Sequence, residues 1–186
     1  MKTHQITGHI GAEISEVELS NLDDGQITSI KQAWLDHKVL VFREQNITRE
    51  QHIAFGRNFG DLEVHPFAPS PEDYPEIVKI ISNEKIQYAA SNWHSDVTWR
   101  QEPSMGSILR GRVIPDVGGD TSFANAAEAY KRLDPDVKTR VDSLYAIHDF
   151  SRTFGRGMSP EERQKRQEEY PPARHPVIRT HPVTGE

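Results

Sequence analysis

A histidine and an aspartate separated by one residue are the first feature of this sequence that could carry chemistry. They are His94 and Asp96, in the segment Asn92-Trp93-His94-Ser95-Asp96-Val97-Thr98-Trp99. The apolar residues around them favour a strand over 93–99, and in a strand residues i and i+2 point to the same face. One imidazole nitrogen and one carboxylate oxygen could then bind a single ion, as two ligands of a 2-His-1-carboxylate iron site. The spacing alone is weak evidence, since it arises often by chance and is more typical of an exposed His–Asp ion pair.

The composition excludes several other classes of site. The chain of 186 residues contains no cysteine, so disulfides, thiolate nucleophiles and cysteine-bound zinc are ruled out and a metal must be held by His, Asp or Glu. The net charge of -6 argues against nucleic-acid and anionic-membrane partners. Neither a spanning apolar run nor a signal peptide is recognisable, so we expect a cytoplasmic protein.

Two other kinds of site, for nucleotide binding and for hydrolysis, have little support in the sequence. Gly118-Gly119-Asp120 lacks the Lys-Ser/Thr and the helix of a phosphate loop, so it predicts a turn. No Gly-x-Ser-x-Gly string supports hydrolase chemistry.

The elements that must position these residues alternate between helical and strand periodicity, which predicts a mixed α and β domain over 1–186. A capping-box pattern at Thr48 begins a helix that we expect to end near Gly60, with Phe55 and Phe59 on its buried face. Other expected helices cover 26–37, 124–133, 136–145 and a charged segment beginning at Ser159-Pro160, and the expected strands cover 38–42, 77–81, 93–99, 105–114 and 175–180. The last five residues indicate a turn without its partner strand, so we expect the domain to be incomplete at its C-terminus.

Several strings in this chain, taken in order, resemble the TauD/TfdA family of taurine dioxygenase-like, Fe(II)- and 2-oxoglutarate-dependent oxygenases. They are the His94–Asp96 segment, Gly11-Ala12-Glu13-Ile14, Val39-Leu40-Val41-Phe42-Arg43, Phe59-Gly60, His65-Pro66, Gly118-Gly119-Asp120-Thr121, His148-Asp149-Phe150 and the stretch from His175 to Pro182. The resemblance implies an α+β fold, a distorted double-stranded β-helix (a cupin-like jelly roll) with flanking helices. It also implies Fe(II), 2-oxoglutarate as cosubstrate, O₂, and a small acidic substrate that is hydroxylated with release of succinate and CO₂.

The resemblance assigns roles position by position. His94 and Asp96 match the two proximal iron ligands, Thr121 matches a residue that hydrogen-bonds 2-oxoglutarate, and His65 matches a substrate-contacting histidine. The distal iron histidine and the arginine that pairs with 2-oxoglutarate fall beyond residue 186. The downstream histidines at 148, 175 and 181 lie in strings whose histidine is not that ligand.

Two departures from the pattern concern the substrate. Ala68 and Ala90 stand where taurine dioxygenase has a tyrosine and an asparagine, which removes polar groups and puts taurine itself in doubt in favour of another sulfonate or small organic acid. Two other functions stay open: a catalytically inactive jelly-roll binding module, and a His/Asp zinc hydrolase, for which the sequence places no general base. Whether the protein forms a homo-oligomer is also left open.

Overall fold

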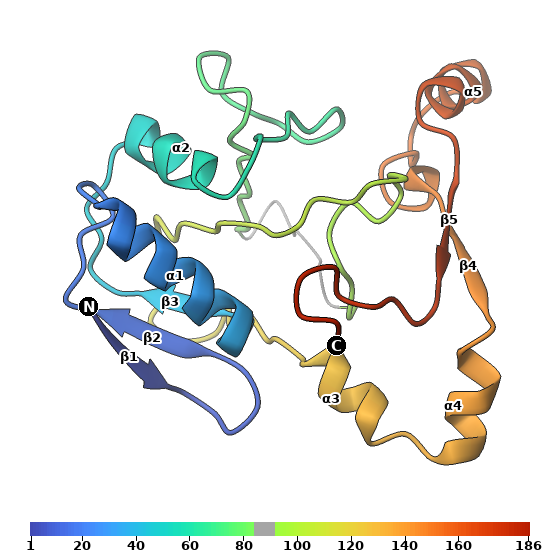
Figure 1. Ribbon diagram of the computed structural model, residues 1–186. Helices are drawn as coiled ribbons and strands as arrows, with labels where there is room; N and C mark the ends of the chain where they lie inside the picture. The colour runs from blue at the N-terminus through green and yellow to red at the C-terminus, as the bar shows by residue number, and fades with distance from the viewer. Residues whose placement is uncertain (84–91) are drawn as a thin grey trace. The chain divides into compact units, whose positions relative to one another are not determined.

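A computed structural model describes residues 1–83 and 92–186 (Figure 1). The chain divides into two units, of which the first comprises Met1–Val64, Arg110–Leu133 and Pro182–Glu186 and the second comprises His65–Leu109 and Asp134–His181. Helices and strands occur in both, which confirms the predicted α+β class. Among the described residues, no helix is both long and apolar enough to cross a membrane.

The first unit is built on a three-stranded mixed sheet. Strand β1 (Lys2–Gln5) pairs antiparallel with β2 (Ala12–Ser15), and β2 pairs parallel with β3 (Leu40–Phe42). A parallel pair needs a crossover connection, and helix α1 (Asp24–His37) provides it. The predicted helix at 26–37 and strand at 38–42 are therefore confirmed, with the strand beginning two residues late.

The core of the first unit lies between this sheet and two helices. Ile14 of β2 and Ile30 of α1 are 2% and 1% exposed, and Phe55 of α2 (Arg49–Arg57) joins them. Phe55 and Phe59 meet edge to face with ring centroids 5.3 Å apart, so the predicted buried face is confirmed. The Thr48 capping box also forms, but the helix ends at Arg57, three residues before Gly60.

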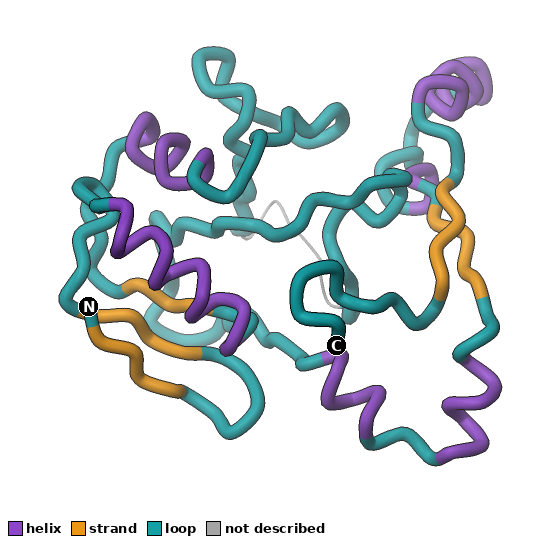
Figure 2. The backbone as a smooth tube through the Cα atoms, viewed as in Figure 1, coloured by secondary structure: helices purple, strands orange, loops and turns teal. Residues whose placement is uncertain are grey.

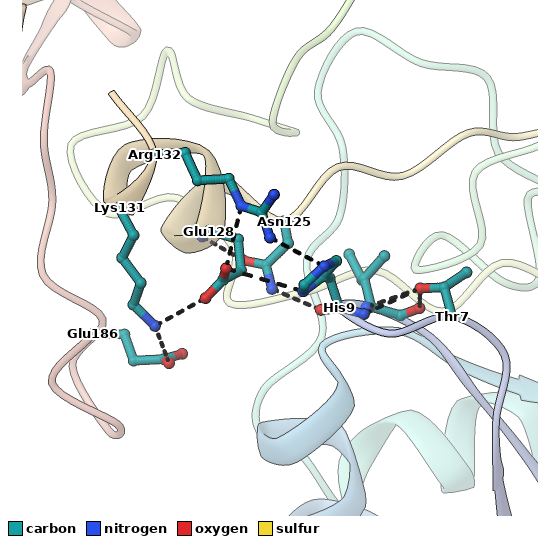
Figure 3. Close-up of polar contacts among 8 residues, drawn as sticks. Thr7, His9, Asn125, Glu128, Lys131, Arg132 and Glu186 are labelled. Carbon is teal, nitrogen blue, oxygen red and sulfur yellow. Dashed lines mark hydrogen bonds and ion pairs between the residues drawn. The ribbon is translucent and has the colours of Figure 1, made fainter. Parts of the chain in front are cut away.

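Polar contacts tie the loop after β1 to helix α3 (Ala126–Lys131), which occupies the middle of the predicted helix at 124–133 (Figure 3). Asn125 donates to the His9 carbonyl at 2.7 Å, and Arg132 donates to His9 Nε2 at 3.1 Å. Glu128 accepts from Lys131 at 3.1 Å, and this hydrogen bond lowers the pKa of the Glu128 carboxyl below its ordinary value. These contacts hold α3 next to the sheet inside the first unit.

Outside residues 84–91, the second unit contains a two-stranded sheet and three helical elements. Helix α4 (Pro135–Val141) leads into β4 (Tyr145–His148), which pairs antiparallel with β5 (Ala173–Pro176). Between the strands lie the short helix η1 (Phe150–Arg152) and α5 (Pro160–Glu169). Helix α5 has no buried residue, and Ser159 is its N-cap as predicted. The predicted helix at 136–145 is shorter than expected because Tyr145 already belongs to a strand.

An aromatic cluster forms the core of the second unit. Phe67 stacks on Phe150 with centroids 4.6 Å apart, and Trp99 meets Phe67 and Tyr170 at 5.3 and 5.4 Å. Phe150 is 1% exposed and Trp99 7%. Since Trp99 lies three residues after Asp96, this cluster anchors the segment that carries the candidate ligands.

Three predicted strands are wrong: those at 77–81, 93–99 and 105–114 follow an irregular path, drawn as loop in Figure 2. A strand is stable only when its backbone N–H and C=O groups pair with a neighbour, and no described segment pairs with these three in a sheet. Many of their apolar side chains are exposed, for example Leu109 at 70% and Val113 at 92%, whereas Trp99 is buried in the aromatic cluster. The strand expected at 175–180 is instead β5, shifted toward the N-terminus. Gly118 and Gly119 have φ of +80° and +75°, which only glycine adopts readily, but the bend of the chain lies at residues 116–117 and no turn is assigned at 118–120.

Candidate metal centre

The segment that carries His94 and Asp96 is a turn. Residues 96–99 form the turn, and the Arg100 N–H donates to the Val97 carbonyl at 3.0 Å. Val97 has a φ of +46°, a left-handed conformation that is unfavourable for a β-branched residue. His94 Nε2 and Asp96 Oδ1 nevertheless lie 3.4 Å apart. The expected convergence of the two side chains is present, although the strand that was to produce it is absent.

Each side chain also makes a hydrogen bond through its second polar atom, the one that does not face the other candidate ligand. His94 Nδ1 lies 2.8 Å from the Asn92 carbonyl oxygen, which can only accept, so Nδ1 carries a proton and Nε2 is the nitrogen left to bind a metal ion. Asp96 Oδ2 accepts from the Ser107 hydroxyl at 2.8 Å. A carbonyl on the far imidazole nitrogen and a hydroxyl on the second carboxylate oxygen are the partners that orient metal ligands in proteins.

The two inner atoms fit a shared ion. Adjacent ligands of an octahedral ion with bonds of about 2.1 Å lie about 3 Å apart, slightly closer than His94 Nε2 and Asp96 Oδ1 are here. The side chains are 54% and 60% exposed, so both can be reached from solvent. A neutral imidazole and a carboxylate are donors typical of iron, manganese and zinc.

A third ligand is not found in the part of the chain that the structure describes, where no group of three His, Cys, Asp or Glu side chains is placed to hold a metal. His148 Nδ1 lies 2.9 Å from the Thr98 hydroxyl, and His175 Nε2 lies 2.9 Å from the carbonyl oxygens of both Thr98 and Arg100. Both imidazoles are thus engaged with the turn that follows Asp96. Among the described residues, His94 and Asp96 remain the two candidate ligands.

His65 belongs to the same unit as the His94–Asp96 pair. Its Nδ1 accepts from the backbone N–H groups of Phe67 and Ala68 at 3.2 and 3.0 Å, so the proton is on Nε2. Its half-buried ring packs against Phe154 and Trp99 with centroid distances of 5.0 and 6.0 Å. His65 is thereby a fixed hydrogen-bond donor in an aromatic setting that also contains Trp99 of the ligand-bearing turn.

Thr121 lies in the other unit, exposed and in irregular structure shortly after Gly118 and Gly119. Its contact with 2-oxoglutarate stays a prediction. Ala90, one of the two positions that distinguish this chain from taurine dioxygenase, lies outside the described residues.

Sequence reasoning missed the residues that hold the two ligands. Asn92 is two residues from His94 and could have been found as a local partner for the imidazole. Ser107 is eleven residues from Asp96 in a stretch predicted as a strand, and no local pattern links the two.

Comparisons with known proteins decide the family. Residues 2–186 match the family described as "Taurine catabolism dioxygenase TauD, TfdA family". The chain belongs to the TauD/TfdA family. This agrees with the resemblance seen in the sequence and places the His94–Asp96 pair within a family of dioxygenases.

Three relatives of this TauD/TfdA chain show the range of the family. An (S)-phenoxypropionate/alpha-ketoglutarate-dioxygenase of Sphingobium herbicidovorans is 34% identical, over 94% of this chain and 64% of its own length. An alpha-ketoglutarate-dependent sulfate ester dioxygenase of Pseudomonas putida is 31% identical, over 100% and 64%. The crystal structure of AAD-2 in complex with Mn(II) and N-oxalylglycine has a TM-score of 0.78 and 29% identity, covering 100% of this chain and 66% of its own. The chain thus spans a little less than two thirds of these relatives.

Proposed function

We propose that this chain forms the iron-binding part of an Fe(II)- and 2-oxoglutarate-dependent dioxygenase that hydroxylates a small organic acid. The observation that carries the proposal is the His94 Nε2–Asp96 Oδ1 pair at 3.4 Å, with the outer atoms of both side chains already engaged. Family membership over residues 2–186 supports the same reaction class.

The residues of this chain have distinct tasks in that reaction. His94 offers a neutral nitrogen, and Asp96 offers a negative oxygen that offsets part of the charge of Fe(II). A second histidine beyond residue 186 is expected to complete the facial triad, and Thr121 is expected to hydrogen-bond 2-oxoglutarate. His94 and Asp96 would hold Fe(II), which would supply the oxidising chemistry when bound together with the cosubstrate. In the overall reaction one oxygen atom enters the substrate C–H bond and the other enters succinate, as 2-oxoglutarate loses CO₂.

The substrate that fits best is an organic anion with an apolar part. His65, which the family resemblance matches to a substrate-contacting histidine, is oriented by the Phe67 and Ala68 N–H groups at Nδ1, and aromatic rings surround it. The relatives named for phenoxypropionate and for sulfate esters act on anions of this kind. Ala68 removes the tyrosine of taurine dioxygenase beside His65, so a more apolar sulfonate or a related acid should be preferred over taurine.

We also propose that residues 1–186 are one part of a single catalytic domain whose complete fold is a distorted double-stranded β-helix. The α+β elements and the TM-score of 0.78 to the longer AAD-2 structure support this.

An anaerobic titration tests the function directly. The full-length protein is titrated with Fe(II) and then with 2-oxoglutarate while the visible charge-transfer band of the chelate is recorded. The band should appear in the wild type and be lost in Asp96→Ala, since one of the two described ligands is removed. A band of full intensity in Asp96→Ala refutes the assignment, and its absence in the wild type favours the inactive binding module.

A substrate panel tests the reaction class. Succinate formation is measured with alkyl sulfonates, sulfate esters, phenoxyalkanoates and taurine. Taurine should have a lower kcat/KM than the best acid of the panel. A taurine value equal to the best would contradict the role given to Ala68.

A further inference from the structure

The turn that follows Asp96 is fastened to the β4–β5 hairpin by two histidines. His148 Nδ1 lies 2.9 Å from Thr98 Oγ1. His175 Nε2 lies 2.9 Å from the carbonyl oxygens of both Thr98 and Arg100. Because carbonyl oxygens only accept, His175 Nε2 carries the proton and donates to both.

The pairing of the hairpin explains why both imidazoles reach the same turn. In the antiparallel register His148 faces Ala173 and Ala146 faces His175, so the two histidines are diagonal neighbours on one face. Their rings lie 5.3 Å apart and both are partly buried. The alternate residue Ile147 is 64% exposed on the opposite face. Because side chains alternate between the two faces of the hairpin, both imidazoles lie on the face that contacts residues 98–100.

The two histidines contact the residues that follow Val97, which has an unfavourable backbone conformation. Val97, with φ at +46°, connects Asp96 to Thr98. A valine in this conformation persists only when its surroundings fix it. The anchoring of Thr98 and Arg100 provides that restraint on one side, and the burial of Trp99 adds to it. The direction of the Asp96 carboxylate toward His94 depends on the same turn.

We infer that His148 and His175 are positioning residues that orient Asp96 for metal binding by fixing the turn at residues 97–100. The inference rests on the proposed function, since it gives the His94–Asp96 pair its role. The two histidines touch neither the metal nor the substrate, and their effect passes through the backbone. Loss of an orienting partner around a metal ligand typically lowers metal affinity by about tenfold to a hundredfold.

The experiment compares His175→Phe with His175→Gln in the full-length protein. Phenylalanine keeps the ring but removes the donor, whereas the side-chain amide of glutamine can donate from a position close to that of Nε2. Anaerobic titration with Mn(II) measures the Kd, and hydrogen exchange of the metal-free protein measures the protection of amides 97–100. His175→Phe should raise the Kd by about tenfold or more and speed exchange in the turn. His175→Gln should restore most of both.

A destabilised control separates positioning from general loss of stability. Ser159→Ala removes the N-cap of α5 in the same unit, away from the turn, and should lower the melting temperature without changing the Mn(II) Kd. Thr98→Val, which removes only the hydroxyl next to His148, should raise the Kd by about threefold to tenfold and serves if His175→Phe does not fold.

Three results would overturn the inference: a wild-type Kd in His175→Phe, an equal weakening in Ser159→Ala, or no recovery in His175→Gln. If the wild-type protein binds no metal, the proposed function itself fails and the inference fails with it. Wild-type binding together with unchanged variants rejects the positioning role alone.

Discussion

Removal of the Ser107 hydroxyl should weaken metal binding without removing a ligand. The hydroxyl donates to Asp96 Oδ2 at 2.8 Å, and this contact keeps Oδ1 directed toward His94 Nε2. In Ser107→Ala the Asp96 carboxylate can rotate about its Cβ–Cγ bond. Metal binding must then restrict a rotation that the Ser107 hydrogen bond already restricts in the wild type.

The expected size of the effect follows from the geometry and the exposure. A hydrogen bond to a charged group contributes about 1.5–3 kcal/mol. The Asp96 side chain is 60% exposed, so water competes for the carboxylate and we reduce the figure to about 1 kcal/mol. This corresponds to about a fivefold increase in Kd.

Anaerobic Mn(II) titration of the full-length protein measures this change. Ser95→Ala makes the same substitution between the two ligands and serves as the matched control, with an expected Kd equal to that of the wild type. Ser107→Thr retains a hydroxyl and should bind nearly as well as the wild type. A Ser107→Ala Kd within twofold of the wild type, or an equal loss in Ser95→Ala, would refute the reasoning.

Three further predictions concern stability. Thr48→Ala breaks the capping box with Gln51 and should lower the free energy of unfolding by about 1 kcal/mol in urea titrations; no change would mean that the cap is replaced by water. Phe150→Ala empties the centre of the aromatic cluster and should lower stability by about 3–5 kcal/mol by the same assay, whereas a loss under about 1 kcal/mol would contradict its burial. Glu128→Gln should reduce the melting temperature at pH 7 but progressively less as the pH falls below 4.5. The folded-state pKa of Glu128 is depressed by Lys131, so its contribution is present above the ordinary glutamate pKa of 4.5 and is lost on acidification. A difference between wild type and variant that is constant from pH 7 to 3 would exclude this ionisation as the cause.

Local signals predicted the helices well because helix ends depend on neighbouring residues. The capping boxes at Thr48 and Ser159 form where the sequence placed them. The C-terminal ends were less accurate, since Arg57 ends α2 three residues before Gly60. Gly56, a weak helix former, lies in the last turn of α2, and hydrogen bonds of the i to i+3 kind at Asn58 and Phe59 follow it, so the helix ends before Gly60.

Strands and the contacts of the site could not be read in the same way because their partners are distant in sequence. The apolar run at 77–81 has strand composition, yet no described segment pairs with it in a sheet, and the Lys79 N–H donates to the Pro69 carbonyl within irregular structure. Asp96 and Ser107 are eleven residues apart, and His148 and Thr98 fifty. The convergence of His94 and Asp96 was predicted from strand geometry and arises from a turn, so the predicted result was correct for a different reason.

The left-handed valine next to Asp96 has a consequence for evolution and engineering. Glycine and asparagine adopt a positive φ more readily than valine, so selection for thermal stability alone should favour them at position 97. Such a chain would gain melting temperature but allow the backbone after Asp96 more conformations, at the expense of a defined site. Retention of Val97 under selection for activity, and its replacement under selection for heat resistance, would identify this residue as a point where the two demands on the protein conflict.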